Sequence, residues 1–268
     1  MFVVYGLRGY NAKMILSRIL VIQFRLRDKT VLLERQSIVR EIGPDVILEF
    51  ISALESTLVW NEPKTLLKKY AGVIFGGSGD FDFDGGRTEQ DQAKSISYQL
   101  LEQLRPLLDY IFLHDIPTLG ICYGHQIIGA YAGAKVIHDE TQKKNCSHEL
   151  SVIVDKDTYC ICDNMPDTFY AHYGHKDSLD RVPEGAVLLM NGGNACQVSA
   201  LSYKQNIFTT QFHPELSFED LYLRVEATPG YLPEGVVVDE AFTKHTEANA
   251  ILYNFGQLVL RNNKEKCL

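Results

Sequence analysis

The chain has 268 residues, of which 46% are hydrophobic, and its 26 basic and 34 acidic side chains give a formal net charge of −8. These values are ordinary for a globular protein that can bury a core, so they exclude a disordered or fibrous chain. The acidic balance argues against binding to nucleic acid or to an anionic membrane surface, because both need clustered Lys and Arg. No run of about 18 apolar residues is present, so the sequence predicts no membrane-spanning helix.

The N-terminal segment lacks the pattern of a secretory signal. Arg18 interrupts the best apolar stretch, whereas a signal needs an unbroken one followed by a cleavage site with small residues. We therefore expect a cytoplasmic protein. Met14 stands just before the first strand-like run, and we interpret residues 1–13 as a dispensable lead-in.

Strands and helices alternate through the first half of the chain. The expected elements are a strand over Ile15–Phe24, a helix over Thr30–Ile42, an apolar run of undecided type over Val46–Leu54, a helix over Pro63–Tyr70, a strand over Gly72–Phe75, a helix over Thr88–His114 that Pro106 should kink or split, a strand over Pro117–Ile121 and a helix through Ala132. This alternation is typical of a mainly parallel sheet with helices on both faces.

The second half is richer in strands. The expected strands are Leu150–Val154, Phe169–Tyr173, Ala186–Met190, Gln197–Tyr203 and Ile207–Gln211, with helices over Leu216–Ala227 and Thr246–Arg261. We predict a flavodoxin-like α/β fold with an antiparallel addition to the parallel sheet. No linker is evident, so a single domain is expected over residues 14–268.

The strongest local motif surrounds Cys122, in the sequence Gly-Ile-Cys-Tyr-Gly-His-Gln that begins at Gly120. A nucleophile on a sharp strand-to-helix turn needs small neighbours two residues before and after it, and Gly120 and Gly124 supply them. The positive end of the following helix favours the thiolate over the thiol. The motif predicts a nucleophilic cysteine.

A base and a glycine turn are available at the ends of two other strands. Phe212-His213-Pro214-Glu215 follows one strand, and a carboxylate two residues from a histidine suits a group that orients the imidazole. Gly76-Gly77-Ser78-Gly79 follows another, where backbone N–H groups near the sulfur could hold an oxyanion.

Together these motifs resemble the class I glutamine amidotransferases, whose glutaminase domain uses a Cys-His-Glu triad. The resemblance is strong over about residues 70–215, and it departs at Ser78, where the family usually carries a proline. It implies that Cys122 attacks the glutamine side-chain amide, that His213 is acid and base, and that Glu215 orients His213.

The same resemblance implies the groups that surround the substrate. The N–H groups of Gly77 and Tyr123 would form the oxyanion hole, and Gln126 would help to hold glutamine. His175-Lys176-Asp177 is similar to a His-x-Asp segment of the glutaminase part of GMP synthase, so His175 and Asp177 are expected in glutamine binding.

Three functions remain open from the sequence. The first is hydrolysis of glutamine, alone or with ammonia passed to a synthase on a separate chain, because no Gly-x-x-x-x-Gly-Lys-Ser/Thr nucleotide loop is present. The second is hydrolysis of γ-glutamyl peptides or conjugates by the same triad. The third is a regulatory protein that has lost activity, against which the intact Cys122, His213 and Glu215 argue.

Other motifs are interpreted as structural, and no metal or cofactor is expected. Disulfides among the six cysteines are disfavoured in a long cytoplasmic chain, and Cys160-x-Cys162 lacks the spacing of a zinc site. Asp80–Gly85 matches the opening of a calcium loop, but its closing position holds Asp91 where glutamate is usual. His172 and His175 have no evident third ligand.

The side chains near these motifs give further expectations. Phe81 and Phe83 are expected to close over the active site, and His125 to face away from Cys122. Residues 216–245 exceed what a glutaminase core needs, and Thr228–Val237 within them holds two prolines and two glycines. We expect this added lobe to set the choice of acceptor or substrate.

Overall fold

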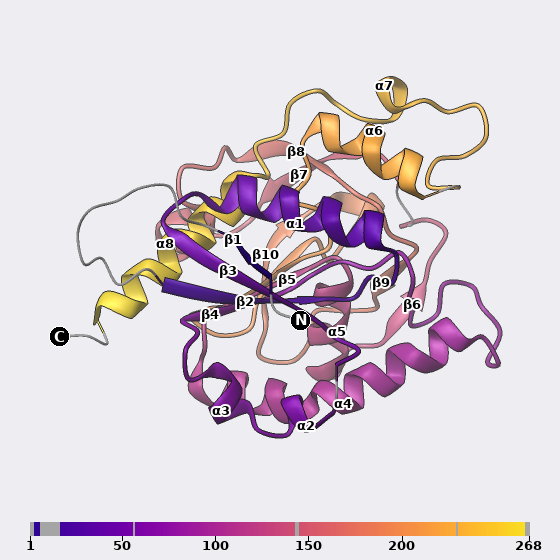
Figure 1. The fold of residues 1–268 in the computed structure, drawn as a ribbon. Coiled ribbons are helices and arrows are strands. Elements are labelled where there is room, and N and C mark those ends of the chain that lie inside the picture. The colour runs from indigo at the N-terminus through magenta and orange to yellow at the C-terminus, as the bar shows by residue number, and fades with distance from the viewer. Residues whose placement is uncertain (1–2, 6–16, 56, 143–144, 229, 266–268) are drawn as a thin grey trace.

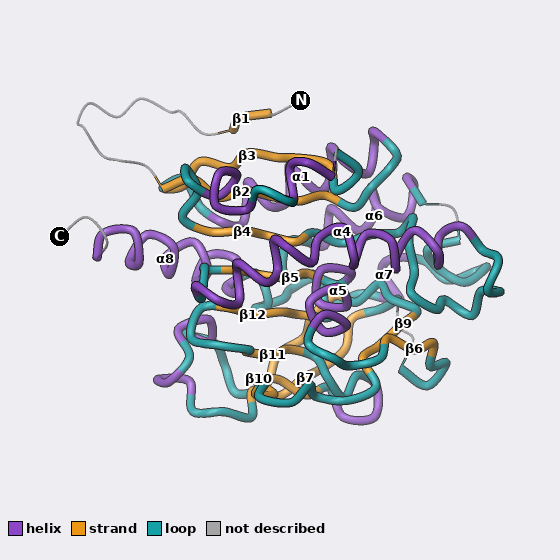
Figure 2. Tube along the Cα trace, turned by 90° about the horizontal axis from the view of Figure 1, so that it is seen from below, coloured by secondary structure: helices purple, strands orange, loops and turns teal. Residues whose placement is uncertain are grey.

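The computed structural model describes residues 3–5, 17–55, 57–142, 145–228 and 230–265. In this part of the chain, ten strands form one mixed sheet in the order β1-β3-β2-β4-β5-β12-β11-β10-β7-β8 (Figure 2). The parallel strands are β2 (Ser17–Gln23), β3 (Val46–Ser52), β4 (Gly72–Phe75), β5 (Thr118–Ile121) and β12 (Ile207–Thr210).

Antiparallel strands extend this parallel core at both ends. They are β1 (Val3–Tyr5), β7 (Ser147–Val152), β8 (Thr168–His172), β10 (Val187–Asn191) and β11 (Ala200–Ser202). A separate two-stranded sheet pairs β6 (Val136–His138) with β9 (Asp177–Leu179). The predicted fold class, a mostly parallel sheet with an antiparallel addition, is confirmed.

Helices cover both faces of the sheet (Figure 1). On one face lie α1 (Asp28–Ile42) and α8 (Ala250–Glu265), and on the other lie α2 (Thr57–Trp60), α3 (Pro63–Leu67), α4 (Gln92–His114) and α5 (Tyr123–Tyr131). Two further helices, α6 (Phe218–Ala227) and α7 (Val238–Ala241), belong to the lobe that follows β12, and α6 packs on α1.

The strand β2 shows why the sheet is buried on both sides. Ile19 and Val21 belong to the cluster under α1 and α8, whereas Leu20 and Ile22 belong to the cluster under α4. Alternate residues of a strand point to opposite faces, so an unbroken apolar run fills two cores. None of the helices in the described residues is long and apolar enough to cross a membrane.

Most predicted elements are present with shifted ends. The strand Gly72–Phe75 has the predicted bounds, and the undecided run from Val46 is a strand. Pro106 does not split α4, because seven buried residues hold that helix against the core. The sequence missed β1, β6, β9, α2 and α7, each only three or four residues long. Met14 lies outside the described residues.

The contact between α8 and the end of α1 depends on a glycine. A Cβ on Gly256 would lie 2.9 Å from the Ile42 carbonyl oxygen, a backbone atom that cannot move aside cheaply. Gly-to-Ala changes in helices normally stabilise by about 1 kcal/mol. We expect Gly256→Ala instead to lower the free energy of unfolding by about 1–3 kcal/mol, measured by urea denaturation.

The matched control is Gly79→Ala, where a Cβ would meet nothing within 4 Å. Its free energy of unfolding should change by less than about 0.5 kcal/mol. A stabilised Gly256→Ala protein would show that the two helices do not pack as closely as the structure has them.

Candidate active site

Cys122 occupies a strained turn between β5 and α5. Its φ of 51° and ψ of −96° are rare for a residue with a side chain. A Cβ on Gly120 would lie 2.8 Å from the Gly124 carbonyl oxygen, and one on Gly124 would lie 2.2 Å from the Phe75 carbonyl oxygen. The turn therefore requires glycine at both positions, which is the steric pattern that the sequence predicted for a nucleophile. The Gly124 N–H also donates to the Gly76 carbonyl at 3.0 Å, so this turn and the glycine turn after β4 fix each other.

His213 and Glu215 lie beside this turn at the end of β12. The two side chains are joined by a 2.7 Å contact between His213 Nδ1 and Glu215 Oε1. The cysteine and the histidine are buried together with that carboxylate. Backbone hydrogen bonds fix their loops, since Cys122 N–H donates to the Thr210 carbonyl and His213 N–H to the His172 carbonyl. The structure thus brings the three predicted triad residues together.

The charges of these three groups support one another. Burial by itself lowers the pKa of His213, but the negative charges of Glu215 and Cys122 more than offset this, so the pKa is raised to about 9. Burial likewise favours a protonated Glu215, yet the His213 charge and its hydrogen bond hold the pKa of that carboxyl well below its usual range. The imidazole is therefore kept protonated beside the sulfur.

A second buried network supports the glycine turn. Glu34 on α1 accepts hydrogen bonds from Arg25 Nε (2.8 Å), Gln23 Nε2 (2.9 Å) and the Gly77 N–H (3.1 Å). Gly77 is the expected oxyanion donor, and in this arrangement its N–H is occupied by the Glu34 carboxylate. To hold an oxyanion it would have to exchange that partner, so its role stays a prediction.

Ser78 and Tyr123 flank the same turn. The Ser78 hydroxyl accepts hydrogen bonds from the N–H groups of Asp80 and Phe81, each at 3.0 Å, and so shapes the loop where the family usually has proline. Tyr123 is the first residue of α5, where backbone N–H groups have no acceptor within the helix. It directly follows Cys122 in the chain, and its expected oxyanion role stays a prediction.

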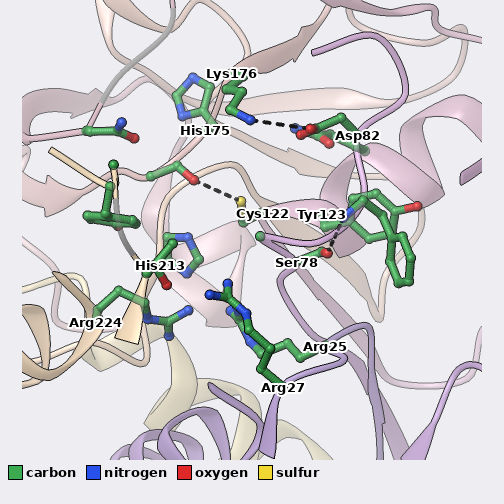
Figure 3. Close-up of a pocket in the computed structure, with 18 residues that line it drawn as sticks. Arg25, Arg27, Ser78, Asp82, Cys122, Tyr123, His175, Lys176, His213 and Arg224 are labelled. Carbon is green, nitrogen blue, oxygen red and sulfur yellow. Dashed lines mark hydrogen bonds and ion pairs between the residues drawn. The ribbon is translucent and has the colours of Figure 1, made fainter. Parts of the chain in front are cut away.

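A cavity of about 250 Å³ opens onto Cys122 (Figure 3). Its volume is slightly below the range common for drug-sized ligands, which suits an amino acid or a small peptide. Gln126 and His175 line the cavity, and their role in binding glutamine stays a prediction. Gln126 also donates to the Asp177 carbonyl at 2.8 Å, which fixes its side chain.

Asp177, which is expected in glutamine binding, contacts backbone N–H groups in the structure. Its buried carboxylate accepts hydrogen bonds from the N–H groups of Asp84 (2.8 Å) and Gly85 (2.6 Å) and is not among the cavity-lining residues. Its contacts hold the acidic loop that begins at Asp80. A role in glutamine binding therefore stays a proposal, and it would operate through this loop.

The acidic loop has protein partners of its own. Asp82 pairs with Arg87 at 2.8 Å and with Lys176 at 3.5 Å, and Asp91 caps the N-terminus of α4. Among the described residues, no group of three or more His, Cys, Asp or Glu side chains could hold a metal ion.

The aromatic and histidine side chains of this region have structural contacts. Phe81 lines the cavity, and Phe83 stacks on the Tyr123 ring with centroids 5.6 Å apart. His125 is buried against Thr209, with 2.8 Å between its Nδ1 and the hydroxyl oxygen. Its expected direction, away from Cys122, agrees with this contact.

The lobe lies at the cavity, and it contributes residues that the sequence did not single out individually. Arg224 on α6 lines the cavity together with Thr228, Gly230 and Tyr231, and a Cβ on Gly174 would lie 2.2 Å from the Tyr231 hydroxyl oxygen. Arg25 was missed as well. It follows β2 by two residues, and a charged side chain at the carboxyl end of a central strand was the available signal.

Fold and site together define an α/β protein that gathers a cysteine, a histidine and a glutamate at the carboxyl edge of a parallel sheet. Residues 51–221 match the family model described as glutamine amidotransferase class-I. The chain belongs to this family.

Similar proteins carry the name of one enzyme of the family. The chain is 35% identical over 118 residues to a subunit of glutamine-hydrolyzing GMP synthase from Methanocaldococcus jannaschii, a match that covers 44% of this chain and 60% of that protein. It is 30% identical over 165 residues to the protein of the same name from Sulfolobus acidocaldarius, covering 59% and 74%. The first of these matches thus spans less than two thirds of the relative.

Solved structures share the fold. A putative GMP synthase subunit from Thermoplasma acidophilum has a TM-score of 0.63 at 19% identity, with 94% of this chain and 98% of that chain covered. A glutamine amidotransferase from Thermotoga maritima has a TM-score of 0.62 at 18% identity, covering 94% and 97%.

The raised pKa of His213 predicts a pH-dependent stability. A histidine in an unfolded chain has a pKa of about 6.5, so the stabilisation is complete below about pH 6.5 and is lost as pH rises through about 9. Glu215→Gln removes the largest cause that raises this pKa. We expect the difference in unfolding free energy between wild type and Glu215→Gln to shrink between pH 6.5 and 9.

Urea denaturation at several pH values measures this difference. Arg105→Gln, which removes an exposed charge on α4, is the control and should show a constant difference from wild type over the same range. A difference for Glu215→Gln that does not vary with pH would contradict the ion pair.

Proposed function

We propose that the protein hydrolyses the side-chain amide of glutamine to glutamate and ammonia through a thioester on Cys122. One observation carries this proposal: His213 is buried between the Glu215 carboxylate and the Cys122 sulfur, with its pKa raised by both. A base oriented by a carboxylate and placed beside a thiol is the arrangement that nucleophilic amide hydrolysis needs.

The reaction has two balanced stages. In the first, the Cys122 thiolate attacks the amide carbon, the C–N bond breaks, and the imidazolium of His213 gives its proton to the departing nitrogen. In the second, His213 takes a proton from water as the hydroxyl adds to the thioester. The C–S bond then breaks, which restores the thiolate and releases the γ-carboxylic acid of glutamate, whose proton passes to ammonia or to solvent. Splitting the reaction lowers each barrier, because amide nitrogen is a poor leaving group.

The remaining residues serve the same steps in this proposal. The Tyr123 N–H, with the Gly77 N–H once it is released from Glu34, would stabilise the oxyanion. Gln126 and His175, which line the cavity, would hold the glutamine. Asp177 would keep the loop from Asp80 in place.

A synthase on a separate chain is the proposed recipient of the ammonia. The relatives are named as one subunit of a glutamine-hydrolyzing GMP synthase, and a subunit by definition belongs to a larger enzyme. The chain carries no nucleotide-binding loop of the Gly-x-x-x-x-Gly-Lys-Ser/Thr form. Co-purification with a synthase chain, together with a rise in glutaminase rate on mixing the two, would support this partner.

The direct test is covalent labelling of Cys122 by a diazoketone analogue of glutamine, located by mass spectrometry. We expect stoichiometric labelling of the wild type and none of Cys122→Ser. Ammonia release from glutamine should fall by about 10²- to 10⁴-fold in His213→Gln, because general acid–base catalysis contributes that much. A wild-type protein that is folded but neither labelled nor active would favour the regulatory alternative.

The lobe is proposed to select the substrate, because Thr228, Gly230 and Tyr231 line the cavity. Removal of residues 228–237 takes away these groups but leaves the triad. We expect the ratio of rates on different γ-glutamyl substrates to change more than the labelling rate of Cys122 by iodoacetamide. If neither changes, the lobe is structural.

A further inference from the structure

Two arginines are buried in the cavity wall with unsatisfied donors. The side chains of Arg25 and Arg224 are only 3% and 4% exposed. Arg25 Nη2 and the Nε and Nη2 atoms of Arg224 have no hydrogen-bond partner among the described residues. Buried polar groups are nearly always paired, and a charged donor left without an acceptor is costly. These three N–H-bearing atoms indicate a site for an acceptor that comes from outside the chain.

The carboxylates nearby do not satisfy these donors. Glu34 is used by Arg25 Nε, Gln23 and the Gly77 N–H. Glu215 binds His213 through Oε1, and this oxygen lies 3.9 Å from Arg224 Nη2, beyond hydrogen-bond distance. Glu215 Oε2 has no hydrogen-bond partner among the described residues, so it does not satisfy the arginine donors either. Burial lowers the pKa of Arg224, and the repulsion between the two guanidinium groups lowers it further. An anion that bridges both arginines would offset the cost of burying the two guanidinium groups and the repulsion between them.

The arginines lie on the side of Cys122 where the leaving group departs. The position of a Cβ on Gly77 is 3.0 Å from Arg25 Nη2, 3.1 Å from His213 Cε1 and 3.8 Å from the Cys122 Cβ, so the three groups converge on one point. His213 protonates the leaving nitrogen and therefore marks that side. In Figure 3, His213, Arg224 and Arg25 lie on one side of Cys122, and His175 lies on the other.

We propose that the site accepts γ-glutamyl compounds whose leaving amine bears a carboxylate, as in a γ-glutamyl peptide, and that Arg25 and Arg224 bind that carboxylate. The inference rests on the proposed thioester chemistry, with an amine in place of ammonia. Arg guanidinium groups bind carboxylates through charge-assisted hydrogen bonds. Both arginines lie outside residues 51–221 that match the family model, whereas Cys122, His213 and Glu215 lie inside it.

The test compares γ-glutamylglycine with γ-glutamylglycinamide, which has the same length but no leaving-group carboxylate, and with glutamine. The wild type should show a kcat/KM at least tenfold higher for γ-glutamylglycine than for the glycinamide. In Arg224→Gln this ratio should fall to within about threefold of unity, whatever its rate on glutamine. Arg105→Gln removes an equal charge far from the cavity and should keep the wild-type ratio.

Each other outcome is decisive. A wild-type ratio near unity overturns the inference whether or not the variant folds, while labelling by the diazoketone keeps the proposed function. If Arg224→Gln raises the KM for glutamine as much as that for γ-glutamylglycine, the arginines bind the α-carboxylate of glutamine instead, and the inference fails.

If Arg224→Gln lowers kcat equally for all three substrates, the arginine affects the reaction only through its neighbour Glu215, and the inference fails as well. Absence of both labelling and cleavage removes the proposed function itself.

Discussion

The site depends on the backbone turn at Cys122. Its positive φ is tolerated because the sheet and the core hold β5 and α5, and because neither flanking glycine brings a Cβ into the neighbouring backbone. The order of the strands in the sheet brings the other site residues to this turn. Strands β2, β4, β5 and β12 are consecutive and parallel, so their carboxyl ends lie at one edge. Arg25, Gly77, Cys122 and His213 follow these four strands in that order, so residues far apart in the sequence meet because the strands are neighbours.

The two buried arginines beside the triad are matched in number by two buried carboxylates. Arg25 and Arg224 face Glu34 and Glu215, so an imidazolium on His213 beside a thiolate on Cys122 adds no net charge to the interior. An unpaired buried charge would be costly, and this balance explains how His213 stays protonated although burial alone opposes it. The two carboxylates match the charge of the two arginines, but they do not form hydrogen bonds with all of the arginine donors.

Sequence reasoning succeeded where the information is local. The turn at the nucleophile needs Gly120 and Gly124 for steric reasons that a short motif records, and the paired His213 and Glu215 follow one strand. It failed where a residue is defined by what packs on it. The sequence did not indicate that the Asp177 carboxylate would bind the N–H groups of Asp84 and Gly85, or that β9, where Asp177 lies, would pair with β6. The sequence also did not indicate that the Gly77 N–H, which is expected to bind the oxyanion, would donate to Glu34 from α1.

The residues proposed for the chemistry lie inside the region that matches the family model, and the residues proposed to select the substrate lie outside it. Residues 51–221 contain the triad, the glycine turn and Gln126, so the family region supplies the groups that the proposed hydrolysis needs. The wall on the side of His213 is built from Arg25 and from the lobe, with Arg224 and Tyr231. The lobe has its own small core of Leu216, Leu221, Val238 and Phe242, so it can hold Arg224 in a fixed position. In the proposed reaction, a rigid wall with unsatisfied cationic donors would select which amine departs as the thioester forms, without altering how water then cleaves the thioester.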